Sequence, residues 1–178
     1  LDLLSQLGAQ LRFFSPLADE PLPDCDAVWL PGGYPELHAA TLAGADVARV
    51  SLAAHVAAGR PVWAECGGMM VLFESLTLID GERHAMWGLL PGEVRMQSRL
   101  AALGPQQWPT RDGELRGHTF HFSSVHTAQV PLAHTESPQG SQRGEAVFAA
   151  GALRASYFHA WFASNPAASA ALFLPEPR

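Results

Sequence analysis

Cys66 stands in the octapeptide WAECGGMM, shortly after the apolar run PVW and directly before two glycines. A cysteine placed between a strand and a helix lies at the helix N-terminus, where the dipole and free N–H groups favour the thiolate. The N–H of Gly67 would then point at the oxygen of a tetrahedral intermediate, as in other nucleophile elbows. A buried structural cysteine in a strand-to-helix turn explains the octapeptide equally well. The motif alone therefore makes Cys66 a candidate nucleophile and no more.

A thiolate nucleophile needs a group that accepts and returns a proton, and histidine is the usual one. His159, in SYFHAWFASNP, ends an apolar strand just before a helix, at the edge where open α/β sheets keep their chemistry. It is the best candidate among the eight histidines, although a buried core histidine would look the same. His118 and His121 are three residues apart in RGHTFHFSS, so on a strand they would point to opposite faces. One of these two is expected to line the site.

Two glycines, Gly32 and Gly33, follow another buried strand in LPGGYPE. Their backbone N–H groups would be free at the carboxyl edge of the sheet and available to an oxyanion. Taken alone, this motif is better explained as an ordinary tight turn. AECGG, PGGYPE and SYFHAWF would all lie at strand-to-helix junctions of one small domain, and together they favour a site.

The order of the elements that the sequence predicts is that of an α/β domain. We expect helices over residues 1–11, 35–58 and from 67 onward, with strands at 11–16, 27–30 and 61–66. This alternation predicts a parallel sheet covered by helices. The middle third holds short, turn-bounded segments that favour antiparallel strands, and residues 133–145 have the composition of an exposed loop.

Composition and charge argue against several classes of function. The 178 residues make one domain, and a net charge of −6 without a cluster of Lys or Arg disfavours nucleic acid or an anionic membrane as a partner. No apolar run approaches the ~18 residues of a membrane span, and the opening LDLLSQLGAQL lacks the features of a signal peptide. Cys25 and Cys66 make no disulfide framework and no zinc motif occurs, so we expect a cytoplasmic protein without a metal site.

Four blocks together resemble one known family. LPGGYPELHA, PVWAECGGMM, RGHTFHFS and ASYFHAWFASNP, in this order and spacing, resemble the C-terminal glutaminase domain of cobyrinic and hydrogenobyrinic acid a,c-diamide synthases. These are class I glutamine amidotransferases of the cobalamin pathway, and the resemblance covers nearly the whole chain. It implies a flavodoxin-like α/β fold: a mostly parallel sheet flanked by helices, with extra short antiparallel strands in the middle third.

The resemblance also implies roles for single residues. Cys66 would attack the side-chain amide of glutamine, and His159 would activate the thiol and then protonate the departing ammonia. The N–H groups of Gly33 and Gly67 would hold the oxyanion. Many glutaminases of this class carry an acid two residues after the histidine, where this chain has Trp161. The resemblance therefore implies a Cys–His dyad whose histidine is oriented by some other group.

Proteins of this family begin with a second domain in which Mg-ATP activates the a and c carboxylates of a corrinoid. No G-x-x-x-x-G-K-[ST] occurs in this chain, so ATP is expected to bind outside it. We expect residues 1–178 to form one amidotransferase domain that lacks the family's first strand, and that needs no cofactor of its own. Its partners would be glutamine and the covalently linked synthetase domain with its corrinoid, and a homodimer stays open.

Two alternatives to an active glutaminase remain. The chain is either a catalytically silent domain that only binds a partner, or another Cys-elbow hydrolase such as a γ-glutamyl hydrolase. Intact Cys66 and His159 disfavour the silent domain. RGHTFHFS and SYFHAWFASNP disfavour the γ-glutamyl hydrolase.

Overall fold

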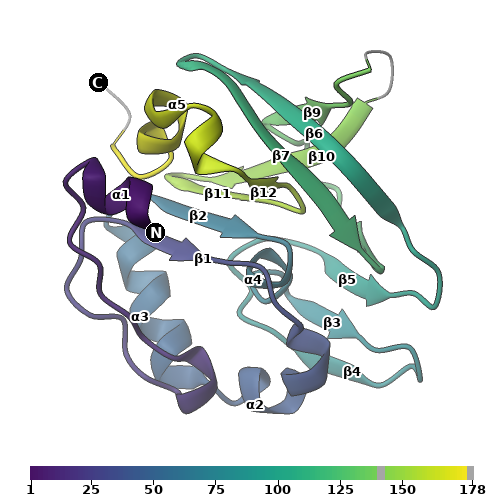
Figure 1. The fold of residues 1–178 in the computed structure, drawn as a ribbon. Coiled ribbons are helices and arrows are strands. Elements are labelled where there is room, and N and C mark those ends of the chain that lie inside the picture. Colours follow the sequence, from purple (N-terminus) through teal and green to yellow (C-terminus); the bar gives the residue numbers. More distant parts are fainter. Residues whose placement is uncertain (140–142, 176–178) are drawn as a thin grey trace.

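The structure is a computed structural model, and it describes residues 1–139 and 143–175 (Figure 1). The α-helices are α1 (Asp2–Gln6), α2 (Ala39–Ala43), α3 (Asp46–Ala57), α4 (Gly67–Met70) and α5 (Pro166–Ala171), with 3-10 turns η1 (Pro16–Ala18), η2 (Pro35–His38) and η3 (Phe162–Ser164). The strands are β1 (Val28–Leu30), β2 (Val62–Glu65), β3 (Ser75–Thr77), β4 (Arg83–Ala85), β5 (Glu93–Met96), β6 (Ala102–Thr110), β7 (Gly113–His121), β8 (Ser123–His126), β9 (Ala133–Glu136), β10 (Arg143–Ala150), β11 (Leu153–Ser156) and β12 (His159–Ala160). None of the described helices is long and apolar enough to cross a membrane.

Two sheets organise the domain. The larger has the order β1-β2-β11-β10-β9-β6-β7-β12, and the smaller has the order β4-β3-β5-β8. In the larger sheet β1, β2 and β11 pair in parallel, and the remaining described pairs are antiparallel. The expected α/β class is therefore confirmed. The parallel part of the larger sheet is a core of three strands, which antiparallel strands extend. The smaller sheet is mixed: β3 pairs with β5 in parallel, and its other two pairs are antiparallel.

Strand β2 is buried on both faces, as its apolar sequence predicts for a central parallel strand. Val62 and Ala64 point into the core under α3 and α4, whereas Trp63 points into a second core and stacks on Trp108 with ring centroids 5.7 Å apart. Burying an indole removes about 150–250 Å² of surface from water, so Trp63 anchors the strand firmly. The residues that follow β2 are thus fixed by packing on both sides.

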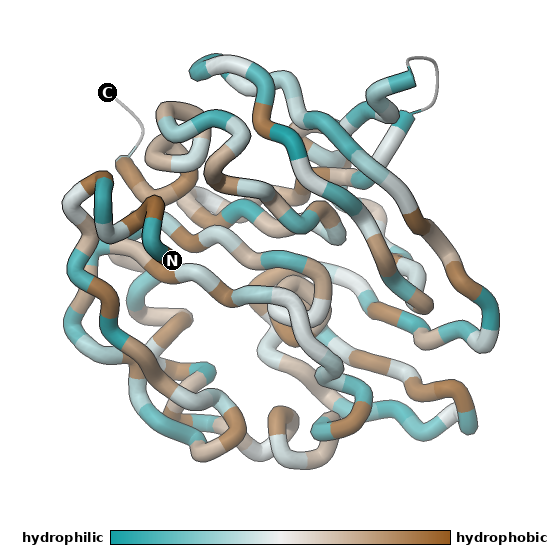
Figure 2. Tube along the Cα trace, viewed as in Figure 1, coloured by the Kyte–Doolittle hydropathy of each residue, from teal (hydrophilic) through white to brown (hydrophobic). Residues whose placement is uncertain are grey.

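The long hairpin of β6 and β7 leans over the carboxyl end of this parallel core (Figure 1). Burial alternates along the second half of β7, because one face of the strand packs on the core and the other faces solvent. Both hydrophilic and hydrophobic residues occur along this hairpin (Figure 2). The two-residue strand β12 pairs with β7, with His159 opposite His118. This pairing places His118, which belongs to the middle third of the sequence, at the edge where β2 and β11 end.

Several local predictions need correction. The single helix expected over 35–58 is divided into η2, α2 and α3, because Gly44 and Ala45 leave the helix and the Asp19 carboxylate accepts from the N–H of Ala48 in the first turn of α3 at 2.9 Å. The helix expected from 67 onward ends after one turn, since the carbonyls of Val71, Leu72 and Phe73 accept from the chain at 87–90 instead.

The predicted strand at 11–16 is also wrong. Within the described residues that segment has no strand partner, and β1 is the edge of the sheet. The loop expected over 133–145 is a loop only in part, because Ala133–Glu136 form β9 and Arg143 begins β10. Residues 140–142 of that prediction lie outside the described residues.

Candidate active site

Cys66 occupies a sharp turn between β2 and α4. Its backbone has φ 44° and ψ −108°, a region that residues other than glycine rarely enter. Such strain persists only where the surroundings enforce it. Here β2 is locked on both faces, and the Cys66 N–H donates to the Ser156 carbonyl of β11 at 2.8 Å. The turn has the backbone form of a nucleophile elbow.

The helix after Cys66 can stabilise a thiolate less than the sequence analysis predicts, because it is short. Helix α4 has four residues, so its dipole is a small source of thiolate stabilisation. The Cys66 side chain is nearly buried, and its Sγ lies 3.8 Å from the Phe120 carbonyl oxygen of β7.

His159 follows β11, the parallel neighbour of β2. Because Ser156 pairs with Glu65 in these two strands, Cys66 and His159 leave the sheet at the same edge. The pKa of His159 is raised to about 9, first by Cys66 and then by Glu65, which together outweigh burial. The structure thus places the His159 ring beside Cys66, and these neighbours favour the protonated imidazole.

The PGG turn closes over this pair. A Cβ added to Gly32 would lie 2.4 Å from Cε1 of His159, and one added to Gly67 would lie 2.4 Å from the Gly33 carbonyl oxygen. Only glycine fits such approaches. Neither the Gly33 nor the Gly67 N–H donates to another group in the described chain, so both are available at the elbow.

Glu65 is a member of the site that the sequence analysis did not select. Its side chain is buried, and its Oε1 accepts from Trp63 Nε1 at 2.6 Å and from the Ala160 N–H at 3.2 Å. The other oxygen, Oε2, lies 3.8 Å from Nδ1 of His159. The available signal was an acid in the otherwise apolar strand VWAE, at the alternate position that shares a face with Trp63.

His118 and His121 point to opposite faces of β7, as their spacing predicts. His118 stacks on His159 with ring centroids 4.9 Å apart, and burial lowers the pKa of His118. His121 is buried, stacks on Tyr157, and contacts Glu145 Oε1 through Nε2 at 3.1 Å. His118 therefore touches the Cys66–His159 site directly, whereas His121 belongs to a buried polar network beside it.

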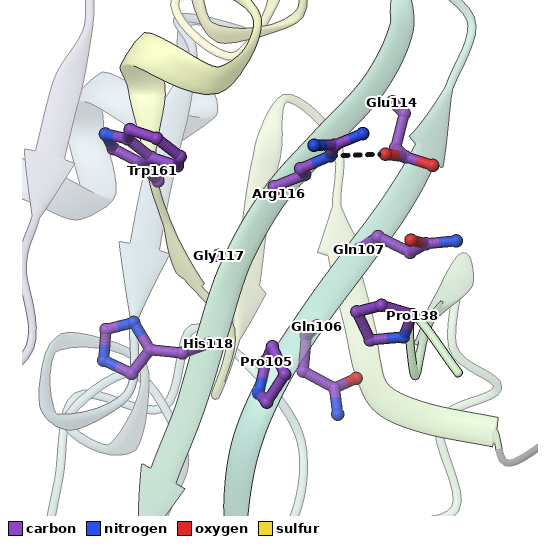
Figure 3. A pocket seen from close by; sticks show the side chains of 9 residues that line it. All are labelled: Pro105, Gln106, Gln107, Glu114, Arg116, Gly117, His118, Pro138 and Trp161. Atoms are coloured by element: carbon purple, nitrogen blue, oxygen red, sulfur yellow. Dashed lines mark hydrogen bonds and ion pairs between the residues drawn. The ribbon is translucent and has the colours of Figure 1, made fainter. Parts of the chain in front are cut away.

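A hollow of about 640 Å³ adjoins His118 on the outer side of the hairpin. Figure 3 shows His118 and Trp161 on one side of β7, and Gln107 and Pro138 on the other. The Arg116–Glu114 ion pair, at 2.8 Å, lies above Gln107 and Pro138 in this view. Trp161 is 63% exposed, so it gives His159 no orienting contact of the kind an acid at that position supplies. In the described residues no three His, Cys, Asp or Glu side chains lie together as a metal site.

The fold and the elbow define a class of protein. A solved structure titled a glutamine amidotransferase superposes with a TM-score of 0.64, covering 96% of this chain and 88% of its own, at 15% identity. This likeness shows the shared glutamine amidotransferase fold.

The family is defined by sequence. Residues 1–167 match the CobB/CobQ-like glutamine amidotransferase domain, and the chain belongs to that family. The cobyrinate a,c-diamide synthase of Herminiimonas arsenicoxydans is 52% identical over 99% of this chain. The hydrogenobyrinate a,c-diamide synthase of Pseudomonas aeruginosa is 52% identical over 98% of it. The chain spans 40% of the length of each of these relatives.

Proposed function

We propose that this chain hydrolyses glutamine through a thioester on Cys66 and supplies the ammonia to an amidating domain. The observation that carries the proposal is a strained, nearly buried cysteine at an elbow, beside a histidine whose pKa is raised to about 9. A cysteine paired with an imidazolium reacts as a thiolate, which is the nucleophilic form. Membership of an amidotransferase family supports glutamine as the substrate.

The proposed reaction has two halves. The Cys66 sulfur attacks the carbonyl carbon of the glutamine side-chain amide, and the C–N bond breaks as His159 transfers its proton to the leaving nitrogen. Ammonia and a γ-glutamyl thioester result. Neutral His159 then takes a proton from water, whose oxygen attacks the thioester carbon, and glutamate leaves as the sulfur–imidazolium pair is restored. The N–H groups of Gly33 and Gly67 would hold the oxyanion in both halves.

The ammonia is proposed to amidate the a and c side-chain carboxylates of cobyrinic or hydrogenobyrinic acid. The names of the relatives support this, as does the 40% of their length that the chain spans. The sequence holds no G-x-x-x-x-G-K-[ST], so activation of the carboxylates by Mg-ATP is proposed to take place in a separate domain. The two relatives have the same sequence identity to this chain, so the proposal covers both corrinoids.

The experiment is a glutaminase assay on the full-length protein, measuring glutamate and ammonia released from glutamine. We expect Cys66→Ala to abolish activity and His159→Asn to lower kcat by about 10²–10⁴-fold. Circular dichroism shows whether each variant is folded.

Three outcomes would contradict the proposal. Activity in folded Cys66→Ala would exclude the thioester. A folded wild-type protein without activity would favour a silent partner domain. Faster cleavage of γ-glutamyl peptides than of glutamine would favour a γ-glutamyl hydrolase.

A further inference from the structure

Glu65 is placed between the two strands that carry the site. It ends β2 one residue before Cys66, and its Oε1 accepts from the Ala160 N–H, one residue after His159. Trp63, on the same face of β2, donates to that oxygen at 2.6 Å. An ionised carboxylate with two donors on one oxygen is fixed in orientation, and its second oxygen is left for another partner.

That second partner is the imidazole of His159. Oε2 of Glu65 lies 3.8 Å from Nδ1 of His159, and the Glu65 side chain is only 4% exposed. The other titratable groups that face this ring are the Cys66 thiol and the stacked imidazole of His118. Contacts between catalytic groups are often long without substrate and shorten when it binds.

The chain offers no acid two residues after the histidine. Trp161 stands there and is exposed, although its own N–H is held by the Arg116 carbonyl at 2.8 Å. An imidazole that exchanges a proton with a thiol must present the correct ring nitrogen, and a hydrogen bond at the other nitrogen sets which one carries the proton. Glu65 is the buried carboxylate that meets this need.

We propose that Glu65 is the positioning residue of His159: it holds the proton on Nδ1 and so presents Nε2 to Cys66. The acid that orients the histidine thus lies beside the nucleophile in sequence, on β2. The expected effect of Glu65 on kcat rests on the proposed glutaminase function. The expected effect of Glu65 on the protonation of the His159 ring does not depend on that function.

Replacing Glu65 by glutamine changes the group that faces the His159 ring and keeps the hydrogen bond that joins β2 to β12. In Glu65→Gln the amide oxygen still accepts from Trp63 and Ala160, so the tie between β2 and β12 is kept. The amide NH₂ then faces Nδ1 of His159, which must become an acceptor. The ring proton moves to Nε2, and the imidazole can no longer take the thiol proton.

The first test is kinetic and uses the full-length protein. Glu65→Gln is expected to lower kcat for glutamine by about 10²-fold while KM changes less than about threefold, because the lost interaction acts in the chemical step. Glu65→Asp keeps the charge on a shorter side chain and is expected to recover about tenfold of that loss. Thermal unfolding identifies a variant that has failed to fold.

The second test needs no activity. The imidazole of His159 is titrated by NMR, and Glu65→Gln is expected to lower its pKa by about one unit by removing a nearby opposite charge. Glu145→Gln is the matched control, since Glu145 is also a carboxylate largely shielded from solvent and in contact with a histidine, His121. It is expected to leave the titration of His159 unchanged.

The outcomes of the two tests are distinguishable. An unchanged His159 titration in folded Glu65→Gln, or an equal shift in Glu145→Gln, would overturn the role of Glu65. A shifted titration in a protein that does not hydrolyse glutamine would support Glu65 and contradict the proposed function. A loss of kcat without any shift would mean that Glu65 does not act through the ring of His159, and would overturn the proposal as well.

Discussion

The imidazole rings of His118 and His159 lie face to face, with centroids 4.9 Å apart and planes 13° apart. They meet because the two residues are register partners in β7 and β12. The pKa of His118 is lowered by burial and then by His159, whereas that of His159 is raised to about 9, first by Cys66 and then by Glu65. Two stacked imidazoles thus take different protonation states, with the charged ring against the sulfur and the neutral one against the hollow.

The raised pKa of His159 predicts the alkaline side of the pH profile. Below about pH 9 the ring is protonated and can give its proton to the leaving ammonia, and above that value this acid is lost. We expect kcat/KM for glutamine to fall above pH 9, because the profile of kcat/KM reports groups of the free enzyme. Steady-state rates between pH 6 and 10 test this, and a descending limb near pH 7 would contradict it.

The stacking of His118 on His159 predicts that two variants of His118 differ in their pH profiles. His118→Lys places a permanent positive charge beside His159 and is expected to move the alkaline limb to lower pH by about one unit. His118→Phe keeps a ring against His159 without a charge and is expected to leave the limb in place. Equal limbs in both variants would mean that the stacked ring has no electrostatic influence on His159.

Gly32 predicts a steric effect on His159. A Cβ there would lie 2.4 Å from Cε1 of the ring, closer than real Cβ contacts, so Gly32→Ala should displace the imidazole. Small misplacements of this kind cost about 10²-fold in rate. Gly44→Ala is the control, because its Cβ would meet only ordinary contacts at 3.7 Å or more. A fully active Gly32→Ala would contradict the close packing of the turn against His159.

The contact between the buried His121 and the partly buried Glu145 predicts an effect on stability. Burial raises the pKa of Glu145, but hydrogen bonds from His121 and Thr119 outweigh it and lower the pKa overall. A carboxyl whose pKa is lowered by folding stabilises the protein above its unfolded pKa, and this contribution is lost as pH falls through the folded value. His121→Phe keeps the stack on Tyr157 and is expected to lower the free energy of unfolding by about 1–3 kcal/mol at pH 7.

Denaturant unfolding of wild type and His121→Phe at several pH values measures this contribution. The difference between them should shrink as the pH falls below the ordinary glutamate value of about 4.5 and then through the lower pKa that Glu145 has in the folded protein. A difference that stays constant down to pH 3 would show that the lost stability comes from packing and not from the carboxylate.

Much of the site is contained in local sequence. AVWL and PVWAE form β1 and β2 as their apolar runs predict, and the glycines and the cysteine that follow lie at the carboxyl ends of those strands. Cys66 and His159 meet because each follows one of two adjacent parallel strands, which the alternation of elements predicts. Fold class and the two main candidates of the site therefore follow from pattern and chain order.

The features that sequence reasoning missed depend on distant partners. Asp19 holds the start of α3 from 29 residues away, and the chain at 87–90 takes the carbonyls that would continue α4. Glu65 is recognisable as a partner of His159 only when β12 has been placed beside β2, since their separation along the chain is 94 residues. Local periodicity carries no information on these long-range hydrogen bonds.

The most direct test of the account is covalent labelling with a glutamine-like chloroketone, mapped by peptide mass spectrometry. The chain has two thiols, and burial raises the pKa of Cys25, so that thiol serves as an internal control. We expect selective modification of Cys66, blocked by excess glutamine and absent in Cys66→Ala. A folded protein that shows no modification, or equal modification of both thiols, would contradict a glutaminase site built on Cys66.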